Sequence, residues 1–276
     1  MKFSIAVLIT CHNRKGKTLQ CLHALFNQKG LSESCLIDVF LVDDGCTDGT
    51  SEAIMQDFPQ VNIIQGNGEL YWNRGMHLAW ETAASVKDFD YYLWLNDDTF
   101  LFENSILELI ECSILSFNNS IICGITCSSI TEEVTYGGYD LKHQKISPNS
   151  KLNSCTLMNG NVVMVPNYCY KILGNLNKSF RHALGDFDYC LRANKLNKIN
   201  VFTSRIFVAN CENNTLTLQC FNYNLPFFKR LSIFYSPLGL NPFEFFIYDK
   251  FENGLIVALK HFVTNHFKVI DFGVKK

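Results

Sequence analysis

Acidic and polar side chains cluster where three apolar segments of the sequence end. Residues 10–14 (TCHNR) close the first segment, residues 43–45 (DDG) follow a second, and residues 96–98 (NDD) follow a third. Adjacent ionised carboxylates repel each other and are costly to desolvate unless a cation or hydrogen-bond donors meet them. Magnesium is commonly held by one or two carboxylates together with substrate phosphates. We therefore interpret Asp98, supported by Asp97, as a ligand of Mg²⁺ or Mn²⁺ that carries a nucleotide diphosphate.

Two common phosphate-binding motifs are absent from the sequence. No GxGxxG follows the first apolar segment, and the chain contains no GxxxxGK[ST] loop. A site without a glycine-rich loop can still hold a diphosphate through a metal on paired carboxylates, which agrees with the cluster at 96–98. The alternative is that the three clusters are solvated turns, with Thr99 capping the helix that follows the third.

Strand-like and helical patterns alternate through the first half of the chain and would position these clusters. Strands are predicted over 3–10, 36–42, 61–65, 91–95 and 120–125. Helices are predicted over 15–28, 74–87 and 103–117, and a further helix follows residues 43–50 and ends at Phe58. The alternation is typical of an α/β fold with a doubly wound, mostly parallel sheet and helices on both faces. Ligands bind such sheets beyond the carboxyl ends of the strands, which is the edge where the three clusters lie.

The second half of the chain is less regular. Residues 133–141 (EVTYGGYDL) indicate a hairpin that turns at their two glycines. Residues 155–166 (CTLMNGNVVMVP) indicate a strand that is broken at its central Asn-Gly pair, and residues 185–196 (GDFDYCLRANKL) indicate a helix. We predict a catalytic domain over 1–214, with a nucleotide-binding half (1–100) and an acceptor half (101–214), and a helical extension over 215–276.

The predicted extension is rich in aromatic residues, and an apolar stripe with lysines beside it runs through residues 243–270. An amphipathic helix that packs on the catalytic domain is one interpretation. Peripheral contact with a membrane is the other, because lysines flank the aromatic face.

Composition restricts the class of protein. The chain has 276 residues, of which 47% are hydrophobic and 18% charged, so it can bury a large core and is unlike disordered proteins. The net charge of −2 provides no field that attracts nucleic acid, and no apolar run is long enough to predict a membrane span. The apolar run at the start lacks a small-residue cleavage site after it, so we interpret it as a strand and expect a cytoplasmic protein. Twelve scattered cysteines without a CxxC pair predict buried, reduced thiols rather than disulfides or a zinc site.

Four motifs occur in order and resemble those of family 2 glycosyltransferases with the GT-A fold. They are VLITCHNR (7–14), VDDGCTDGT (42–50), LNDDT (95–99) and GDFDYCLRA (185–193). The similarity covers roughly residues 1–210. Two further segments, GNGELYWNRGMHLAW and YSPLGLNPFEFF, resemble a subgroup that makes bacterial surface polysaccharides, rhamnosyltransferases among them.

The resemblance implies roles for the first two clusters. Thr10, His12 and Arg14 stand where the family contacts the base and ribose of the nucleotide. Asp43 and Asp44 stand where a carboxylate of the family accepts hydrogen bonds from the base and ribose.

The resemblance also implies roles for the third cluster and for the segment before it. Asp98 matches the metal-binding aspartate of the DxD-like motif, next to Asp97, and Asn96 stands where the first aspartate often lies. Arg74 would reach the diphosphate, and His77 replaces the asparagine that is usual in this segment.

Asp186 matches the catalytic aspartate of the family, with Gly185 where glutamate is common. Transfer of a sugar to a hydroxyl requires a base for the acceptor proton, which contributes roughly 10²–10⁴-fold, and a charge sink for the departing diphosphate. One base on the far face of the anomeric carbon is sufficient for inversion. The alternative for Asp186 is an ordinary acid at a helix start, and we interpret Asp188 as the structural partner of Arg192.

Three other side chains have two interpretations each. Tyr71 and Trp72 form either a platform for a sugar or base, or part of the core. His182 either lines the acceptor site or is a solvated loop residue.

We therefore predict an inverting, metal-dependent transferase that moves one sugar from a nucleotide-diphosphate donor, with UDP or dTDP favoured. The acceptor would be a hydroxyl of a glycan or lipid-linked glycan in bacterial surface polysaccharide synthesis, at the inner face of the membrane if the extension contacts lipid. The QxxRW signature of processive synthases is absent after Asp186, which favours single additions. A sugar nucleotidyltransferase, which normally has a glycine- and lysine-bearing loop after the first strand, is an alternative. A non-catalytic carbohydrate-binding relative is another, although it would be expected to have lost Asp98 or Asp186.

Overall fold

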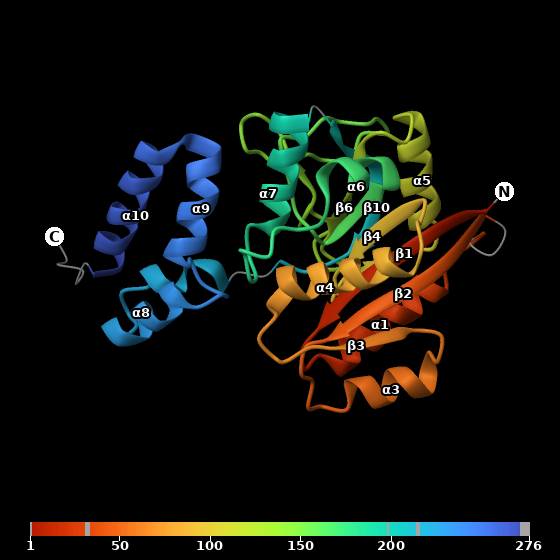
Figure 1. The fold of residues 1–276 in the computed structure, drawn as a ribbon, viewed down its shortest axis with the longest axis horizontal. Helices are drawn as coiled ribbons and strands as arrows, with labels where there is room; N and C mark the ends of the chain where they lie inside the picture. The colour runs from red at the N-terminus through yellow and green to blue at the C-terminus, as the bar shows by residue number, and fades with distance from the viewer. Residues whose placement is uncertain (1, 31–33, 198, 214–215, 271–276) are drawn as a thin grey trace.

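The computed structural model describes residues 2–30, 34–197, 199–213 and 216–270. Its main part is an eight-stranded sheet in the order β3-β2-β1-β4-β9-β6-β10-β5, with helices on both faces (Figure 1). The strands are β1 (Phe3–Cys11), β2 (Cys35–Asp43), β3 (Asn62–Gln65), β4 (Tyr91–Leu95), β5 (Phe100–Leu101), β6 (Ile121–Cys127), β7 (Gly138–Tyr139), β8 (Leu157–Met158), β9 (Val162–Pro166) and β10 (Val201–Asn210). The α-helices are α1 (Lys15–Phe26), α3 (Thr50–Asp57), α4 (Tyr71–Val86), α5 (Ser105–Leu115), α6 (Asn167–Leu173), α7 (Gly185–Leu191), α8 (Phe227–Tyr235), α9 (Pro242–Asn253) and α10 (Leu255–Ile270).

The direction of winding changes between β1 and β4. From β1 the chain adds β2 and then β3 on one side, all parallel, and then crosses to place β4 parallel to β1 on its other side. In a doubly wound sheet the loops at such a switch point separate and leave a crevice for a ligand. The loops that follow β1 and β4 carry residues 12–14 and 96–98, so two of the three predicted clusters meet at this point.

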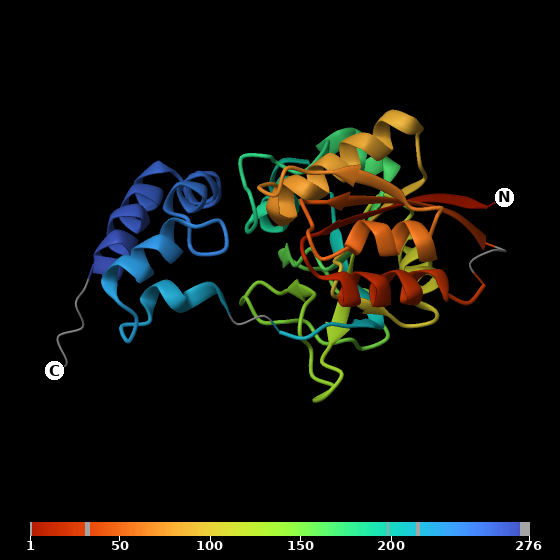
Figure 2. The same cartoon turned by 90° about the horizontal axis from the view of Figure 1, so that it is seen from below.

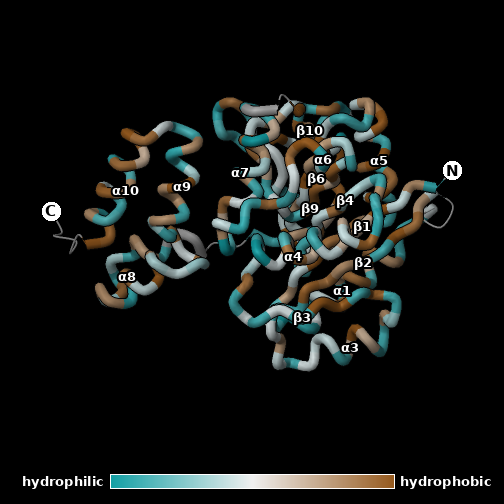
Figure 3. Tube along the Cα trace, in the orientation of Figure 1, coloured by the Kyte–Doolittle hydropathy of each residue, from teal (hydrophilic) through white to brown (hydrophobic). Residues whose placement is uncertain are grey.

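Two hydrophobic layers hold the sheet between its helices. Ile5, Val7 and Ile9 of β1 pack on one face with buried residues of α1, α3 and α5. Ala6 and Leu8 point to the other face, where they join buried residues of α4, α6 and α7. Successive side chains of a strand point to opposite faces, so a strand that is covered on both sides has a continuous apolar sequence. Figure 3 shows the hydrophobic residues concentrated in these central strands.

The second half differs from the prediction in two ways. β9 lies antiparallel between β4 and β6, and the sheet is extended by β10 and β5, which the sequence patterns did not predict. The predicted hairpin over 133–141 is wrong, because β7 pairs with β8 in a separate two-stranded sheet. The chain turns instead after Asp140, whose Oδ1 accepts from the amides of Lys142 and Gln144. An aspartate whose side chain accepts hydrogen bonds from amides two to four residues later in the chain stabilises a turn, so no glycine is required there.

Residues 243–270 lie in two helices, α9 and α10, rather than in the single helix expected there. α9 and α10 are separated at Gly254, whose φ of 88° lies in the left-handed region that favours glycine. Figures 1 and 2 show α8, α9 and α10 as a group beside the sheet domain, with α9 nearest to α7. The two parts are joined by the Arg181 Nε–Glu244 Oε1 ion pair (2.6 Å) and by contact between the rings of Phe187 and Tyr248. The predicted boundary at 214/215 lies outside the described residues.

Two expectations from composition concern cysteines and membrane spans. All twelve cysteines are free thiols and all except Cys46 are buried, as predicted. Burial raises the pKa of several of them, for example that of Cys112 to about 12. Within the described ranges, no helix has the length and hydrophobicity needed to cross a membrane.

Candidate active site

An acidic pair faces one arginine at the switch point between β1 and β4. Arg14 Nη1 donates to Asp97 Oδ1 (3.2 Å) and to Asp98 Oδ2 (2.9 Å), and Lys17 Nζ lies 4.0 Å from Asp98. Asp97 is buried, and its pKa is raised to about 7, because burial outweighs the attraction of Arg14 and Asp98 adds repulsion. Asp98 is the more accessible of the two carboxylates. Asp97 is therefore partly protonated near pH 7, and Arg14 and Lys17 both lie beside the pair.

The chemistry of this pair is compatible with a divalent metal. Among the described residues, no group of three or more His, Cys, Asp or Glu side chains could enclose an ion. Magnesium nevertheless requires only one or two carboxylates when substrate phosphates and water complete its shell. Asp98 is partly accessible and beside a buried carboxylate of raised pKa, so an added cation would be stabilised there. The metal role of Asp98 and the cofactor role of Asp97 stay predictions.

Asp44 positions the segment that leads into α4. Its Oδ1 accepts from the amide of Gly68 (2.8 Å), and its Oδ2 accepts from the amides of Leu70 and Tyr71 (2.9 Å each). A carboxylate with three backbone donors satisfies the first free amides of a helix. Asp44 thus fixes the start of α4 relative to β2, and its predicted contact with the ribose or base stays a prediction.

Asp43 and His12 are also engaged within the chain. Asp43 Oδ1 accepts from the amide of Cys46 (2.6 Å), and its Oδ2 accepts from the hydroxyl of Ser51. His12 Nδ1 donates to the carbonyl of Asp44 (2.6 Å), which ties the loop after β1 to the loop after β2. These bonds place both residues at the predicted edge, while their nucleotide contacts stay predictions.

Thr10 lies at the carboxyl end of β1, beneath the first turns of α4. It is buried, and a Cβ at Gly75 would lie 2.2 Å from Thr10 Oγ1. Only glycine at 75 therefore allows α4 to approach β1 this closely. Thr10 supports α4 in the structure, and its predicted contact with the nucleotide stays a prediction.

Arg74 and His77 connect α4 to the loop that precedes the predicted catalytic residue. Arg74 Nε donates to the carbonyl of Lys178 (2.9 Å), and His77 Nδ1 donates to the carbonyl of Leu176 (2.7 Å). His77, whose role the sequence left open, thus holds this loop. Arg74 bonds to the loop as well, so a reach toward the diphosphate stays a prediction.

Asn73 explains the glycine at 185. Its Nδ2 donates to the carbonyls of Asn177 (2.8 Å) and Phe180 (2.7 Å), while its Oδ1 has no hydrogen-bond partner among the described residues. A Cβ at Gly185 would lie 1.7 Å from that oxygen. The glutamate that is common at this position in the family therefore has no space here.

Asp186 is the second residue of α7 and is half-buried. Its Oδ2 accepts from the amide of Gly160 and its Oδ1 from the amide of Phe187, both at 2.9 Å. Burial raises the pKa of Asp186 to about 6, although the two amides oppose the shift. A carboxylate with a pKa just below neutral is ionised at pH 7 yet basic enough to accept a proton, as a general base requires.

Trp72 connects Asp186 to the cluster after β4. Its Nε1 donates to Asn96 Oδ1 (2.6 Å), and its ring lies against Gly160, where a Cβ would be 2.4 Å from two ring carbons. That same Cβ would lie 3.3 Å from the Cβ of Asp186. Trp72 is thus part of the site wall and not only of the core. Asn96 orients this ring through its side chain, and its predicted ribose contact stays a prediction.

His182 lies on the same side of the site as Tyr71. The two rings are 6.4 Å apart, and the histidine is half-buried. Burial, and then the charge of Arg14, lower the pKa of His182, so it is neutral at pH 7. The structure favours a position in the site over a solvated loop.

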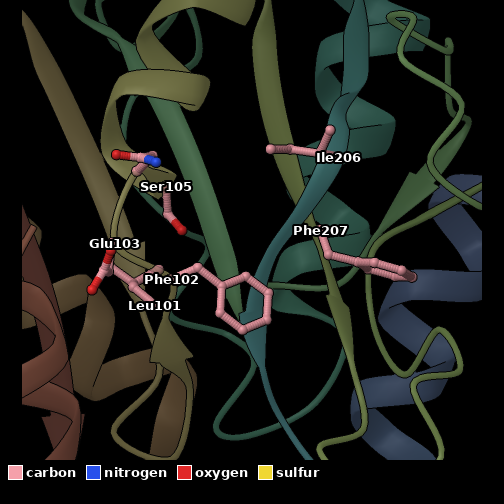
Figure 4. A pocket seen from close by; sticks show the side chains of 7 residues that line it. Leu101, Phe102, Glu103, Ser105, Ile206 and Phe207 are labelled. Carbon is pink, nitrogen blue, oxygen red and sulfur yellow. The ribbon is translucent and has the colours of Figure 1, made fainter. Parts of the chain in front are cut away.

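A separate cavity of about 460 Å³ opens between β5 and β10 at the sheet edge (Figure 4). It is lined by Leu101, Phe102, Glu103, Asn104, Ser105, Ile206 and Phe207, none of which belongs to the predicted site.

Comparisons with known proteins agree with the fold. Among solved structures, S. aureus TarS is similar with a TM-score of 0.58 and 14% identity, over 97% of this chain and 45% of that chain. TarS 1–349 in complex with UDP has a TM-score of 0.57 and 14% identity over 97% of this chain and 74% of that one. TarS 1–349 in complex with UDP-GlcNAc has a TM-score of 0.57 and 15% identity, over 97% of this chain and 75% of that chain. The predicted GT-A type α/β fold is confirmed, and the chain spans less than half the length of full TarS.

The sequence comparison identifies the family. No curated protein matches the chain. The family described as Glycosyl transferase family 2 matches residues 6–170, which is more than half of the chain and includes the clusters at 10–14, 43–45 and 96–98. The chain therefore belongs to glycosyltransferase family 2.

Proposed function

We propose that this chain transfers one sugar, with inversion, from a nucleotide-diphosphate donor to a hydroxyl of a glycan or lipid-linked glycan. The observation that carries this proposal is the arrangement around Trp72. Its ring nitrogen bonds to Asn96, beside the acidic pair at 97–98, and its ring lies against Gly160, whose amide binds Asp186. A charge-binding cluster and a carboxylate of raised pKa therefore both border one aromatic side chain, an arrangement that suits a two-substrate transfer.

In the proposed reaction, Asp186 accepts the proton of the acceptor hydroxyl. The acceptor oxygen then bonds to the anomeric carbon from the face opposite the diphosphate, whose bond to that carbon breaks, so the configuration inverts. Asp98, with Asp97, would hold Mg²⁺ or Mn²⁺, which as a Lewis acid would neutralise charge on the diphosphate. Arg14 contributes a fixed positive charge on the same side, 2.9 Å from Asp98.

The donor and acceptor classes are part of the proposal. TarS has been solved with UDP and with UDP-GlcNAc, which supports a nucleotide-sugar donor, and we propose UDP or dTDP as its nucleotide. We further propose a role in bacterial surface polysaccharide synthesis in the cytoplasm, with peripheral membrane contact through the C-terminal helices.

A screen of nucleotide sugars by thermal unfolding, with Mg²⁺, with Mn²⁺ and with chelator, tests the proposal. A ligand at 100 times its Kd stabilises the native state by about 2.7 kcal/mol and so raises the Tm by several degrees. The donor found in this way is then incubated with candidate acceptors, and NMR of the product reports the anomeric configuration. Retained configuration would overturn the inverting mechanism. Stabilisation by a nucleoside triphosphate and sugar phosphate, with release of pyrophosphate, would indicate a nucleotidyltransferase instead.

A further inference from the structure

One face of α10 is apolar and exposed along the length of the helix. We call it the outer face of α10. It consists of Ile256, Leu259, Val263, Phe267 and Ile270. Their spacing of three and four residues places them in a single stripe, and the exposed fraction reaches 84% at Ile256 and 68% at Phe267. No described part of the chain covers these side chains.

The opposite face of α10 packs on the neighbouring helices. Ala258 and Val269 are buried there. His261 Nδ1 bonds to Asp249 Oδ2 of α9 (2.7 Å), and His266 Nε2 bonds to the hydroxyl of Tyr235 of α8 (2.9 Å). A surface helix that contacts only its own protein usually has polar residues on its outer side, whereas α10 has a second apolar stripe there.

The charges around the outer face have one sign. Lys260 and Lys268 of α10 and Lys250 of α9 are exposed, and α10 contains no acidic residue. In residues 216–270, Glu244 is buried in an ion pair with Arg181, Asp249 is buried and hydrogen-bonded to His261, and Glu252 is half-buried. The described extension therefore presents lysines without exposed carboxylates to compensate them.

We propose that the outer face of α10 lies on an anionic lipid bilayer. Amphipathic helices with lysines beside a stripe of large apolar residues bury that stripe at the level of the headgroups, while the lysines remain with the lipid phosphates. Because no described helix is able to span a membrane, α10 would lie in the plane of the interface. Both views place α10 at the outer edge of the molecule, with α9 between it and the sheet domain (Figures 1 and 2). The inference specifies the membrane contact that is part of the proposed function and rests on it, but its test does not require the transfer reaction.

Flotation of the full chain with vesicles tests the proposal. We expect binding to vesicles that contain phosphatidylglycerol, weaker binding to pure phosphatidylcholine, and weakening by salt. The double variant Ile256→Asp/Phe267→Asp removes the apolar contact at two points and should lower binding by roughly tenfold or more. Lys260→Glu/Lys268→Glu should abolish the preference for the anionic lipid.

The matched control is Ile130→Asp/Leu141→Asp, since these residues of the sheet domain are 84% and 86% exposed and should not affect flotation. A second copy of this chain is the other candidate to cover the outer face of α10, and light scattering of the wild type reports whether the protein is a dimer. A dimer that the Ile256→Asp/Phe267→Asp variant dissociates, together with no binding to vesicles, would assign the face to a second copy and overturn the proposal. Flotation that this variant leaves unchanged would also overturn it. The stabilisation of each of the three double variants by the nucleotide-sugar donor in thermal unfolding should equal that of wild type, so failure here is distinguishable from failure of the transferase assignment.

Discussion

Replacement of Asp186 by asparagine tests whether this residue is the catalytic base. Asparagine has the size and polarity of aspartate but does not accept the acceptor proton. The carboxylate bonds to the amides of Gly160 and Phe187 and not to the cluster at 96–98. Donor affinity, measured by calorimetry, should therefore change little. Turnover, measured by release of the nucleotide diphosphate, should fall by about 10²–10⁴-fold, which corresponds to about 3–5 kcal/mol in the barrier.

The pH dependence follows from the raised pKa of Asp186. With a pKa of about 6, the base is ionised at neutral pH and protonated below it, so wild-type turnover should rise with pH through about 6. The variant should lack this limb. A pH profile that keeps the limb in Asp186→Asn would assign it to another group.

Stability provides a second and independent readout. The folded pKa of Asp186 lies about two units above its ordinary value of 3.8, which corresponds to a cost of about 3 kcal/mol in the ionised folded state. That cost is absent below pH 4 and is present in full above pH 6, so acidification stabilises wild type relative to the variant. Asparagine removes the cost but loses one of two amide bonds, worth about 1 kcal/mol.

At pH 7.5 the variant should therefore be at least as stable as wild type in thermal unfolding, and a loss of turnover would not reflect misfolding. The catalytic assignment fails if Asp186→Asn retains turnover within tenfold, or if turnover falls only as donor affinity falls. Asp188 and His182 would then be the next candidates, tested as Asp188→Asn and His182→Gln.

Three further outcomes are expected. Asp98→Ala should abolish metal-linked binding of the nucleotide diphosphate without unfolding the protein, and equal affinity of wild type with excess chelator in calorimetry would contradict the metal assignment. Asp188→Asn should lower the free energy of unfolding in urea by about 1 kcal/mol, because the charge of the pair with Arg192 is lost although the asparagine oxygen is still able to accept from Arg192 Nε, and because burial already raises the pKa of Asp188, while donor affinity should be unchanged. Thiol titration of denatured protein without reductant should find nearly all twelve cysteines free, and a loss in pairs would contradict this.

The sequence predicts well those elements whose pattern is local. β1 and β4 are buried on both faces and have continuous apolar sequences, and their ends are marked by polar residues, so both the strands and the clusters after them were predicted. Ligands bind a parallel sheet beyond the carboxyl ends of its strands, so the clusters at 10–14 and 96–98 were predicted to lie at that edge. The strand order, which makes these two clusters neighbours, was not predicted.

Elements that depend on long-range contacts were not predictable in this way. β10 contains Thr203, Ser204 and Arg205, and becomes a strand because it pairs with β6, about eighty residues earlier. Its Arg205 has carboxylate partners on α5, Glu108 and Glu111, which no local pattern reveals. The size of the Asp188 effect is a similar case. The spacing of Asp188 and Arg192 predicts a helical surface pair, worth about 0.5 kcal/mol, whereas the structure buries the aspartate.

The first turn of α4 shows why the site required the structure. The sequence placed Trp72 equally in the core or at a sugar, and did not single out Asn73. In the structure, Trp72 contacts Gly160 and Asn73 fills the space beside Gly185, so both residues of the turn meet glycines from the catalytic half. Because Asp44 fixes the start of this helix by three amide bonds, a displacement of the loop after β2 would move both contacts together. The two halves of the site are therefore held at a fixed separation by α4, and the absent family glutamate at 185 is a consequence of that packing rather than an isolated loss of a carboxylate.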